Sequence, residues 1–561
     1  MSRREAWLSV ALVAAVALVV RIWAASLITF PRPEDTAYYV SVARTLVEGR
    51  GLVSDAIWSY GTPPLEFPRP AFEVWLPLPT YLAAIPMALL GTTFAAAQWF
   101  SIIVGTLVAV LAWRLGADVA AERAMPPGRA RTLAVGSGLV AAVFLPLVLY
   151  SVLPDSTMLF AALVLGACLL AGRVARDARG VRGDDRDPHD PRVARDARGV
   201  RGGDRRVVAL GLVLGLAALT RNEAAWLALG WVVVARGIAK DAGVGAGGWA
   251  RLVVGAALPA MLVFGPWAIR DWIAFGSPLP GQALANALSL KGTDIFAWSQ
   301  PPTIDRYLAA GLPTLAGLRW TGLLHNLISV LLLPGIPIAA IGLVALPGTA
   351  RAASFRLLVL FAIVTFAITT LLFPVATTWG TFLHASAAIQ VLLIISALLV
   401  LDALIAAVGR WRDWTRPVAW LGPCLGIGAG VLFTAVLLPT FGRDGDATRD
   451  QYAALPAALA AAGVPLTPGD GPVISRFPIW LADTTRVRTL ALPDEPPEAV
   501  LDLARAFPGT TLVIAAPGND ELWPGIAATD PIGIQCFKPV PLVGPPSGVL
   551  DDLRVFRITC P

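Results

Sequence analysis

Apolar runs of about 20 residues recur along this chain from its N-terminus to Pro439, each long enough to cross a hydrocarbon core of about 30 Å. Lipid offers a backbone no hydrogen-bonding partners, so a continuous apolar run of this length forms a helix. Strands of transmembrane β-barrels instead alternate apolar and polar residues, a pattern that these runs lack. The sequence therefore predicts a polytopic α-helical membrane protein.

The composition agrees with lipid as the solvent of most of the chain. Of its 561 residues, 56% are hydrophobic and 15% are charged, whereas a soluble domain carries about 25% charged residues. The net charge of +6 would suggest a nucleic-acid partner in a soluble protein. In a membrane protein a positive balance reflects arginines in cytoplasmic loops, so we expect no nucleic-acid partner.

The distribution of arginine predicts the topology. Eleven runs are candidate spans: residues 6–28, 94–113, 133–153, 156–172, 207–220, 224–235, 252–269, 323–346, 357–373, 382–408 and 418–439. With a cytoplasmic N-terminus and the short run 80–90 not crossing, every arginine-rich loop is cytoplasmic, as the positive-inside rule requires. These loops are residues 114–131, 173–206, 236–251, 351–356 and 410–416. We expect about 11–13 spans in the plasma membrane, the first of them an uncleaved span.

The cytoplasmic loop 173–206 contains an exact duplication, because residues 174–183 and 193–202 both read VARDARGVRG. Arg and Asp dominate the loop, so it cannot bury enough apolar surface to offset the entropy of ordering. We expect it to be disordered, with binding of anionic lipid headgroups as the alternative role.

The chain changes character after Pro439, where Asp444, Asp446 and Asp450 and frequent Pro and Gly predict a soluble region. Residues 472–475, 511–515 and 553–559 have the pattern of strands, and residues 497–506 that of a helix. We expect a transmembrane domain over residues 1–440 and a small extracytoplasmic α/β domain over residues 441–561. Cys536 and Cys560 could form a disulfide if this tail is extracytoplasmic.

The first extracytoplasmic loop, residues 31–79, mixes charged and aromatic residues. A helical pattern begins at Glu34 and Asp35 and stops at Gly49 and Gly51. The rest of the loop carries Glu66, Arg69 and Glu73 among Trp58, Phe67, Phe72 and Trp75. This combination suits a membrane-surface site for a lipid and a polar substrate, or else an interfacial aromatic belt with solvated acids.

Polar residues also mark the other turns predicted on this face. They are Asp155, the turn Arg221-Asn222-Glu223, the pair Arg270-Asp271, and His384. Charges this close to a membrane are costly unless they are paired or face a polar cavity. Arg221 and Glu223 could simply pair with each other, and a lone histidine near a helix end is more often structural than functional.

The order of these motifs resembles the GT-C superfamily of polyprenyl-phosphate-sugar glycosyltransferases, in particular the protein O-mannosyltransferase and aminoarabinose lipid A transferase group. Asp35-x-x-x-Tyr39-x-x-x-Ala43-Arg44, followed by Gly49-x-Gly51, resembles the start of that family's first extracytoplasmic loop. Pro266-Trp267-x-x-Arg270-Asp271-x-x-x-Phe275-Gly276-Ser277-Pro278 resembles a second family motif, and Arg221-Asn222-Glu223 a recurring turn. The likeness runs to about Val408. The chain departs from the family at Thr36, where a second acid is usual, at Asp271, where asparagine is common, and in lacking a His-Pro-Pro-Leu motif.

The resemblance implies a GT-C-like fold and a glycosyltransferase that moves a hexosyl or pentosyl group from a polyprenyl-phosphate-linked sugar, with inversion. Asp35 would act as general base on a hydroxyl of a lipid, protein or polysaccharide acceptor. The donor phosphate would be met by Arg221, Arg270 and Arg69. The supporting or substrate-binding residues would be Glu34, Tyr39, Glu66, Glu73, Asp155, Glu223 and His384. No soluble cofactor is implied, and a divalent metal could bind at Glu34, Asp35 or Asp155, although no ligand spacing supports it.

Two other functions remain as alternatives. A multi-pass transporter or lipid flippase would also place charges near helix ends, but transporters often show paired repeats, and these spans show none. A catalytically inactive relative that binds a lipid-linked sugar is the other alternative, and the retained Asp35 argues against it.

Overall fold

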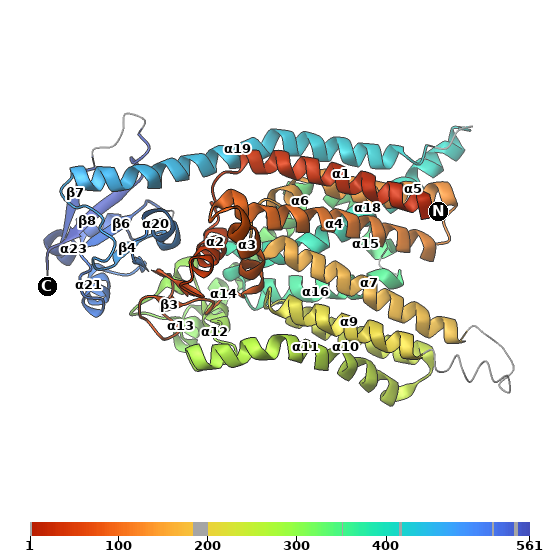
Figure 1. The fold of residues 1–561 in the computed structure, drawn as a ribbon, viewed down its shortest axis with the longest axis horizontal. Coiled ribbons are helices and arrows are strands. Elements are labelled where there is room, and N and C mark those ends of the chain that lie inside the picture. Colours follow the sequence, from red (N-terminus) through yellow and green to blue (C-terminus); the bar gives the residue numbers. More distant parts are fainter. Residues whose placement is uncertain are drawn as a thin grey trace.

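The computed structural model describes residues 3–182, 200–349, 352–414, 418–518, 521–542 and 548–560. Long helices form a bundle, and a small α/β domain lies beyond one end of it (Figure 1). Within the described residues, eight helices are long and apolar enough to cross a membrane. They are Arg3–Leu27 (α1), Phe94–Glu122 (α4), Ser156–Ala178 (in α7), Gly245–Phe275 (α11), Gly311–Gly335, Ala353–Leu371, Ala387–Trp411 (α18) and Leu421–Ala461 (α19). The chain is a multi-pass membrane protein.

Shorter helices complete the bundle. These are α5 (Pro127–Val143), α6 (Leu145–Tyr150), α9 (Val200–Ala218), α10 (Ala224–Ala242) and α15 (Ile338–Thr349), whereas α16 (Arg356–Leu371) forms most of the span Ala353–Leu371. Small residues let them pack closely, as in other membrane bundles. A Cβ at Gly211 of α9 would lie 2.2 Å from the carbonyl oxygen of Ala256 in α11, and one at Gly342 of α15 2.1 Å from that of Leu393 in α18. The predicted 11–13 spans would have to include several of these shorter helices.

Two segments differ from simple spans. The predicted span 323–346 is divided among α14 (Gly311–Leu324), the π-helix η3 (His325–Leu332), the short η4 (Leu333–Gly335) and α15. Pro334 and Pro337 account for the break, because proline has no N–H to continue an α-helical hydrogen-bond ladder. The apolar run at 80–90 lies in α3 (Leu78–Leu90), whose 13 residues span only about 20 Å.

Ion pairs join the arginine-rich helix ends to one another. Arg176 at the end of α7 lies 3.0 Å from Asp118 and 3.1 Å from Glu122, both at the end of α4. Arg129 of α5 pairs with Asp402 of α18, and Arg356 of α16 pairs with Asp241 of α10. These ends lie with the N-terminus at one end of the bundle, whereas α2 (Glu34–Val47), α3 and the α/β domain lie at the other (Figure 1). The chain therefore has the two-sided charge distribution that the sequence predicts.

The predicted disordered loop 173–206 is partly helical. α7 (Ser156–Arg182) continues to Arg182 and α9 begins at Val200, so both ends of the loop extend the flanking helices. Arginine is a good helix former, which favours such extensions beyond the apolar run. Residues 183–199, including most of the second copy of the duplication, lie outside the described part of the chain.

The C-terminal region contains the predicted strands and helix. β4 (Val473–Ser475), β6 (Leu512–Ala515) and β8 (Arg554–Ile558) match the three predicted strands, and α21 (Pro497–Ala506) matches the helix. With β5 (Thr489–Ala491) and β7 (Phe537–Val540) they form a sheet in the order β2-β5-β4-β6-β8-β7. The edge strand β2 (Ala56–Ile57) comes from the first loop and pairs in parallel with β5. The first loop and the C-terminal region therefore share one sheet and one apolar core.

The predicted domain boundary at residue 440 falls inside a helix. α19 is 41 residues long and runs without interruption from Leu421 to Ala461. Asp444, Asp446 and Asp450 lie on this helix, so they do not open a separate folded region. Alanine, arginine and glutamine between residues 443 and 461 favour helix, which explains why the change in polarity is not a change in secondary structure.

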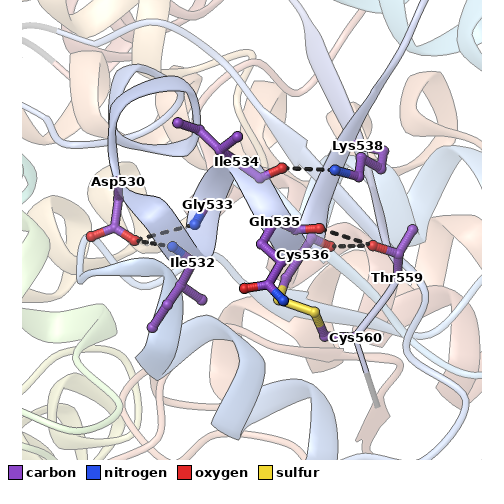
Figure 2. The surroundings of a disulfide bond; sticks show 9 residues. All are labelled: Asp530, Ile532, Gly533, Ile534, Gln535, Cys536, Lys538, Thr559 and Cys560. Carbon is purple, nitrogen blue, oxygen red and sulfur yellow. Dashed lines mark hydrogen bonds between the residues drawn. A yellow bond between two sulfur atoms is a disulfide. The ribbon is translucent and has the colours of Figure 1, made fainter.

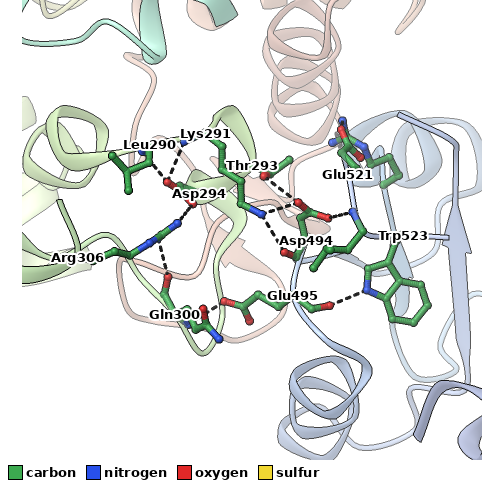
Figure 3. A network of polar contacts seen from close by, with 12 residues as sticks. Leu290, Lys291, Thr293, Asp294, Gln300, Arg306, Asp494, Glu495, Glu521 and Trp523 are labelled. Carbon is green, nitrogen blue, oxygen red and sulfur yellow. Dashed lines mark hydrogen bonds and ion pairs between the residues drawn. The ribbon is translucent and has the colours of Figure 1, made fainter. Parts of the chain in front are cut away.

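A second polar network connects the α/β domain to the segment after α11 (Figure 3). The Asp494 carboxylate, 8% exposed, accepts hydrogen bonds from the Lys291 ammonium at 2.7 Å and the Thr293 hydroxyl at 3.2 Å. Glu495 accepts from the backbone N–H groups of Ser299 and Gln300. The domain thus holds both the first loop and the segment between α11 and α14.

A disulfide closes the end of the domain. Cys536, the last residue of α23 (Pro531–Cys536), is bonded to Cys560, which follows β8 (Figure 2). Asp530 caps α23 by accepting hydrogen bonds from the N–H groups of Ile532 and Gly533. The bond thus ties the end of β8 to the end of α23.

We expect Cys536 and Cys560 to resist alkylation in protein purified without reductant and then denatured. Cys168 and Cys424, which are free, should react and serve as internal controls. Mass spectrometry of the alkylated peptides would measure this. Reaction of all four cysteines would contradict the disulfide.

Candidate active site

Asp35 lies in the first turn of α2, a short helix between the bundle and the α/β domain. Pro33 precedes this helix, and Glu34 and Asp35 occupy the N-terminal turn, where the helix dipole favours negative charge. The predicted stop is confirmed, because α2 ends at Val47 and Gly49 adopts a φ of +80° that residues with a Cβ rarely take. Although α2 is largely buried, 33% of the Asp35 side chain is exposed. Part of the Asp35 side chain is therefore accessible, although burial still acts on its carboxyl group.

His384 connects Asp35 to a second buried acid. In α17 (Thr381–Ala385), His384 places its Nε2 atom 3.3 Å from Asp35 Oδ2 and its Nδ1 atom 2.6 Å from the Thr157 hydroxyl. The same Nδ1 atom lies 4.0 Å from Asp155 Oδ2. Asp155 in turn accepts hydrogen bonds from the backbone N–H of Thr157 at 2.7 Å and from the Thr36 hydroxyl at 3.4 Å. The histidine thus orders a chain of polar groups across three segments.

The surroundings of Asp35 favour its charged form. Burial alone would raise its pKa, but the hydrogen bond and charge of His384, the charge of Arg221 and a hydrogen bond from Trp75 outweigh it. The net effect holds the pKa of Asp35 below its ordinary value of 3.8. Burial instead raises the pKa of Asp155, despite the opposing charge of His384. Two carboxyl groups near one histidine therefore differ in their affinity for a proton, as acid–base pairs in active sites often do.

Arg221 lies close to Asp35 and is already paired. Its guanidinium donates to both Glu223 carboxylate oxygens, at 2.8 and 3.0 Å, and to the Ser156 hydroxyl at 2.8 Å. The alternative that Arg221 and Glu223 pair with each other is therefore confirmed. The charge of Arg221 nevertheless helps to lower the pKa of Asp35 and opposes the rise that burial causes in the pKa of Tyr39. Arg221, Tyr39, Asp155, Glu223 and His384 thus gather around Asp35.

Arg270 lies in a neighbouring aromatic cluster. Its guanidinium pairs with Asp271 at 2.9 Å and lies over the rings of Trp267 and Phe275, at 4.7 and 5.2 Å from their centroids. Its charge acts on Tyr38, whose ring lies 4.2 Å from that of Trp75. Trp75 also helps to lower the pKa of Asp35, so one layer of aromatic side chains lies between Arg270 and the Asp35 group.

Arg69 and Glu73 form a buried pair within the first loop. Their charged groups lie 3.2 Å apart, with 1% of each side chain exposed. Arg69 also donates to the carbonyl oxygens of Ser59 and Thr62, each at 2.7 Å. These contacts shape the loop and leave Arg69 without an accessible surface for a phosphate. Glu66 lies exposed at the loop surface.

Glu34 points toward the α/β domain. Its Oε1 atom accepts a hydrogen bond from the backbone N–H of Ile479 at 3.2 Å, at the start of α20 (Pro478–Thr485). Burial raises the pKa of Glu34 to about 8, although this hydrogen bond and the charge of Arg476 oppose the shift. Within the described residues, no group of three or more His, Cys, Asp or Glu side chains is arranged to hold a metal ion. Glu34, Asp35 and Asp155 do not form such a group.

Several residues of this site carry weak sequence signals. Ser156 and Thr157 follow Asp155 directly, so the turn that places Asp155 also places their hydroxyls. Trp75 is one of many aromatic residues in the first loop, and nothing local marks it as the one that affects the pKa of Asp35. Ile479 and Arg476 lie in the C-terminal region, where no motif indicates contact with α2.

Comparison with known proteins rests on structure. No protein-family model and no curated protein matches this sequence. The structure is similar to ArnT from Cupriavidus metallidurans bound to undecaprenyl phosphate, with a TM-score of 0.54 and 14% identity over 98% of this chain and 97% of that one. It also matches the oligosaccharyltransferase of Archaeoglobus fulgidus, with a TM-score of 0.48 and 14% identity over 97% of this chain and 75% of that one.

This chain has a GT-C fold. The likeness to ArnT covers the C-terminal α/β region as well as the helices. It therefore extends beyond Val408, where the motifs end. The fold class predicted from the motifs is confirmed, while the roles of individual residues in this GT-C fold remain predictions.

We expect Glu34 to make stability depend on pH. Its pKa rises from an ordinary 4.5 to about 8 on folding, so the folded state holds a proton that the unfolded state releases. This contribution is complete below about pH 4.5 and is lost as the pH rises toward 8, since the unfolded state then binds fewer protons. The apparent melting temperature of detergent-purified protein should fall across this window.

The variant Glu34→Gln isolates this effect. An uncharged amide still accepts the hydrogen bond from Ile479, so we expect a flatter dependence of melting temperature on pH than in the wild type. The other charged or titratable groups around Glu34 are Arg476, Asp35 and Tyr452, and all remain in the variant. Identical slopes in the two proteins would show that Glu34 does not titrate in this range.

Proposed function

We propose that this chain is a membrane glycosyltransferase that moves a sugar from a polyprenyl-phosphate donor to an acceptor hydroxyl, with inversion and with Asp35 as general base. The supporting observation is a partly exposed aspartate with a lowered pKa, 3.3 Å from His384 Nε2 and under the influence of the charge of Arg221. General-base catalysis requires such a carboxylate within hydrogen-bond reach of the reacting hydroxyl. The fold shared with ArnT, which was crystallised with undecaprenyl phosphate, supports a polyprenyl donor.

In the proposed reaction, Asp35 accepts the proton of the acceptor hydroxyl as its oxygen attacks the anomeric carbon. A new glycosidic C–O bond forms while the C–O bond to the phosphate breaks, and the electron pair leaves with the phosphate. The attack comes from the face opposite the leaving group, so the configuration inverts. The proton that Asp35 gains is later released to solvent, which restores the carboxylate.

His384 would hold Asp35 for this step. Its Nε2 atom faces the Asp35 carboxylate while its Nδ1 atom is hydrogen-bonded to the Thr157 hydroxyl. This arrangement satisfies both ring nitrogens and fixes the orientation of the ring. The Asp35 oxygen that does not face His384 would then remain available to the acceptor.

The leaving phosphate needs a fixed cation, and the planar guanidinium of arginine matches phosphate geometry well. Arg221 is our first candidate because its charge acts at Asp35, and Arg270 is the second because it borders the same aromatic layer. Ser156 would assist by holding the Arg221 guanidinium in place. Arg69 is a weaker candidate, because its donors are already engaged by Glu73 and two carbonyl groups.

We further propose that the site faces the extracytoplasmic side of the plasma membrane. The arginine-rich helix ends lie at the opposite end of the bundle from α2, as the positive-inside rule requires of this orientation. The disulfide of the α/β domain favours the same orientation. The acceptor is then a lipid, protein or polysaccharide of the cell envelope.

We expect Asp35→Asn to abolish sugar transfer while leaving the helical fold intact. An amide is uncharged and cannot accept the hydroxyl proton. Mass spectrometry of envelope extracts would first identify the glycan that loses a residue in a deletion strain, and complementation with each variant would then be compared. Circular dichroism of the purified variant would check the fold.

The matched control is Asp305→Asn, which removes an exposed carboxylate from α13 (Ile304–Ala309) in the segment after α11. It should complement fully. Transfer that persists in Asp35→Asn would remove Asp35 as the base. Uptake of a substrate into proteoliposomes without bond formation would instead favour the transporter alternative.

We expect the double variant Arg221→Gln with Glu223→Gln to weaken binding of undecaprenyl phosphate by about 1–3 kcal/mol, the usual range for a hydrogen bond to a charged group. Changing both partners avoids leaving Glu223 buried without a counter-charge. Calorimetric titration of detergent-purified protein would measure the affinity. The control is Arg443→Ala, which removes an exposed arginine from α19. Equal affinities of the double variant and this control for undecaprenyl phosphate would exclude Arg221 from the donor site.

A further inference from the structure

The α/β domain contacts the helix that carries Asp35 through a short helix. α20 (Pro478–Thr485) packs against α2. On the bundle side, Val40 and Ala43 of α2 pack with α3 and α4, and the Thr36 hydroxyl donates to Asp155. α2 is therefore held between the transmembrane bundle and a domain that lies more than 400 residues later in the sequence.

The first contact between the two helices lies beside Asp35. Glu34 accepts a hydrogen bond from the Ile479 N–H at 3.2 Å. One residue later, the indole N–H of Trp480 donates to the carbonyl oxygen of Pro31 at 3.2 Å. The start of α20 is thus bonded both to the first turn of α2 and to the chain that leads into it.

The second contact lies near the other end of α2. Arg44 forms an ion pair with Asp483 of α20, and only 11% and 12% of these side chains are exposed. The Arg44 Nε atom also donates to the carbonyl oxygen of Thr92, just before α4. A buried pair of this kind cannot lose one partner without leaving a charge that neither water nor protein compensates.

Two separated anchors constrain a helix more than one does. Glu34 and Arg44 are ten residues apart, which corresponds to about 15 Å along a helix. A single contact would allow α2 to pivot, whereas two contacts at this distance fix its position and its direction. Asp35 lies next to the first anchor, so a small pivot would move its carboxylate relative to His384. A displacement of about 1 Å at a reacting group can lower a rate about 100-fold.

We infer that α20 positions the Asp35 carboxylate for catalysis, and that Asp483 and Arg44 are positioning residues for the transfer reaction. The kinetic part of this inference rests on the proposed function. The structural part, that α20 restrains α2, does not. The α/β domain then serves the reaction directly, through its contacts with α2.

The variant Asp483→Asn tests this inference in purified full-length protein. We expect faster hydrogen–deuterium exchange of the α2 backbone, measured by mass spectrometry of the peptides that cover it. We also expect kcat to fall about tenfold with the KM for the polyprenyl donor within about twofold, because alignment is lost while donor contacts remain. Asp483→Glu, which keeps the charge, should recover most of the rate.

The chain supplies a matched control between the same two helices. Glu48, directly after α2, pairs with Arg486, directly after α20, at 3.2 Å, with 33% and 47% of their side chains exposed. Exposed ion pairs contribute little, so Glu48→Gln should leave both exchange and kcat unchanged. Glu34→Ala, which removes the other anchor, should also speed exchange in α2 and lower kcat.

Unchanged exchange in α2 of Asp483→Asn and Glu34→Ala would overturn the inference, whatever the enzyme does. Faster exchange with unchanged kcat would show that α20 restrains α2 without positioning the base. Loss of transfer in Asp35→Asn tests the proposed function separately, so failure of one conclusion is distinguishable from failure of the other. A lower kcat that Asp483→Glu fails to recover would exclude the ion pair as its cause.

Discussion

A carboxylate at the edge of a hydrocarbon layer remains charged only where donors and cations replace the water that it loses. Asp35 meets this requirement through His384, Trp75 and Arg221, which together outweigh the effect of burial on its pKa. Each comes from a different part of the chain, and each is held by further contacts. Arg221 is fixed by Glu223 and Ser156, and His384 by Thr157. The arrangement of several helix ends therefore follows from the need to support one negative charge.

The sequence predicted the residues of this site better than their pairing. Asp155, Arg221 and His384 were identifiable because charged or polar residues interrupt apolar runs on one face of the membrane. The same reasoning could not separate Arg221 from Arg270, since both end helices on that face. In the structure, Tyr38 and Trp75 lie between Arg270 and Asp35, so Arg221 is the arginine nearer to the site. The position of these two rings depends on how the first loop folds. The pair Arg69 and Glu73 lies outside any helix, so a spacing of four residues gave no local signal of their contact.

Strand predictions succeeded where apolar runs were continuous, as at Leu512–Ala515. They failed for β2, because two residues show no periodicity and its partner lies at Thr489–Ala491. Local composition also led to a domain boundary inside α19. The acidic residues after Pro439 make this part of the helix polar, but its backbone remains helical. In the predicted span 323–346 the polarity stays constant and the backbone changes. Pro334 and Pro337 interrupt the helix, although the segment remains apolar.

The parallel pairing of β2 with β5 also has a consequence for biosynthesis. Ala56 faces Thr489 in the sheet, so more than 400 residues are made between the two strands. Chains fold broadly from the N-terminus during synthesis, but this edge strand must wait until the C-terminal segment has been made. The first loop consequently remains incomplete throughout insertion, and Asp35 reaches its final surroundings only when the last part of the polypeptide arrives. Assembly order thereby delays the formation of the site until the whole protein is present.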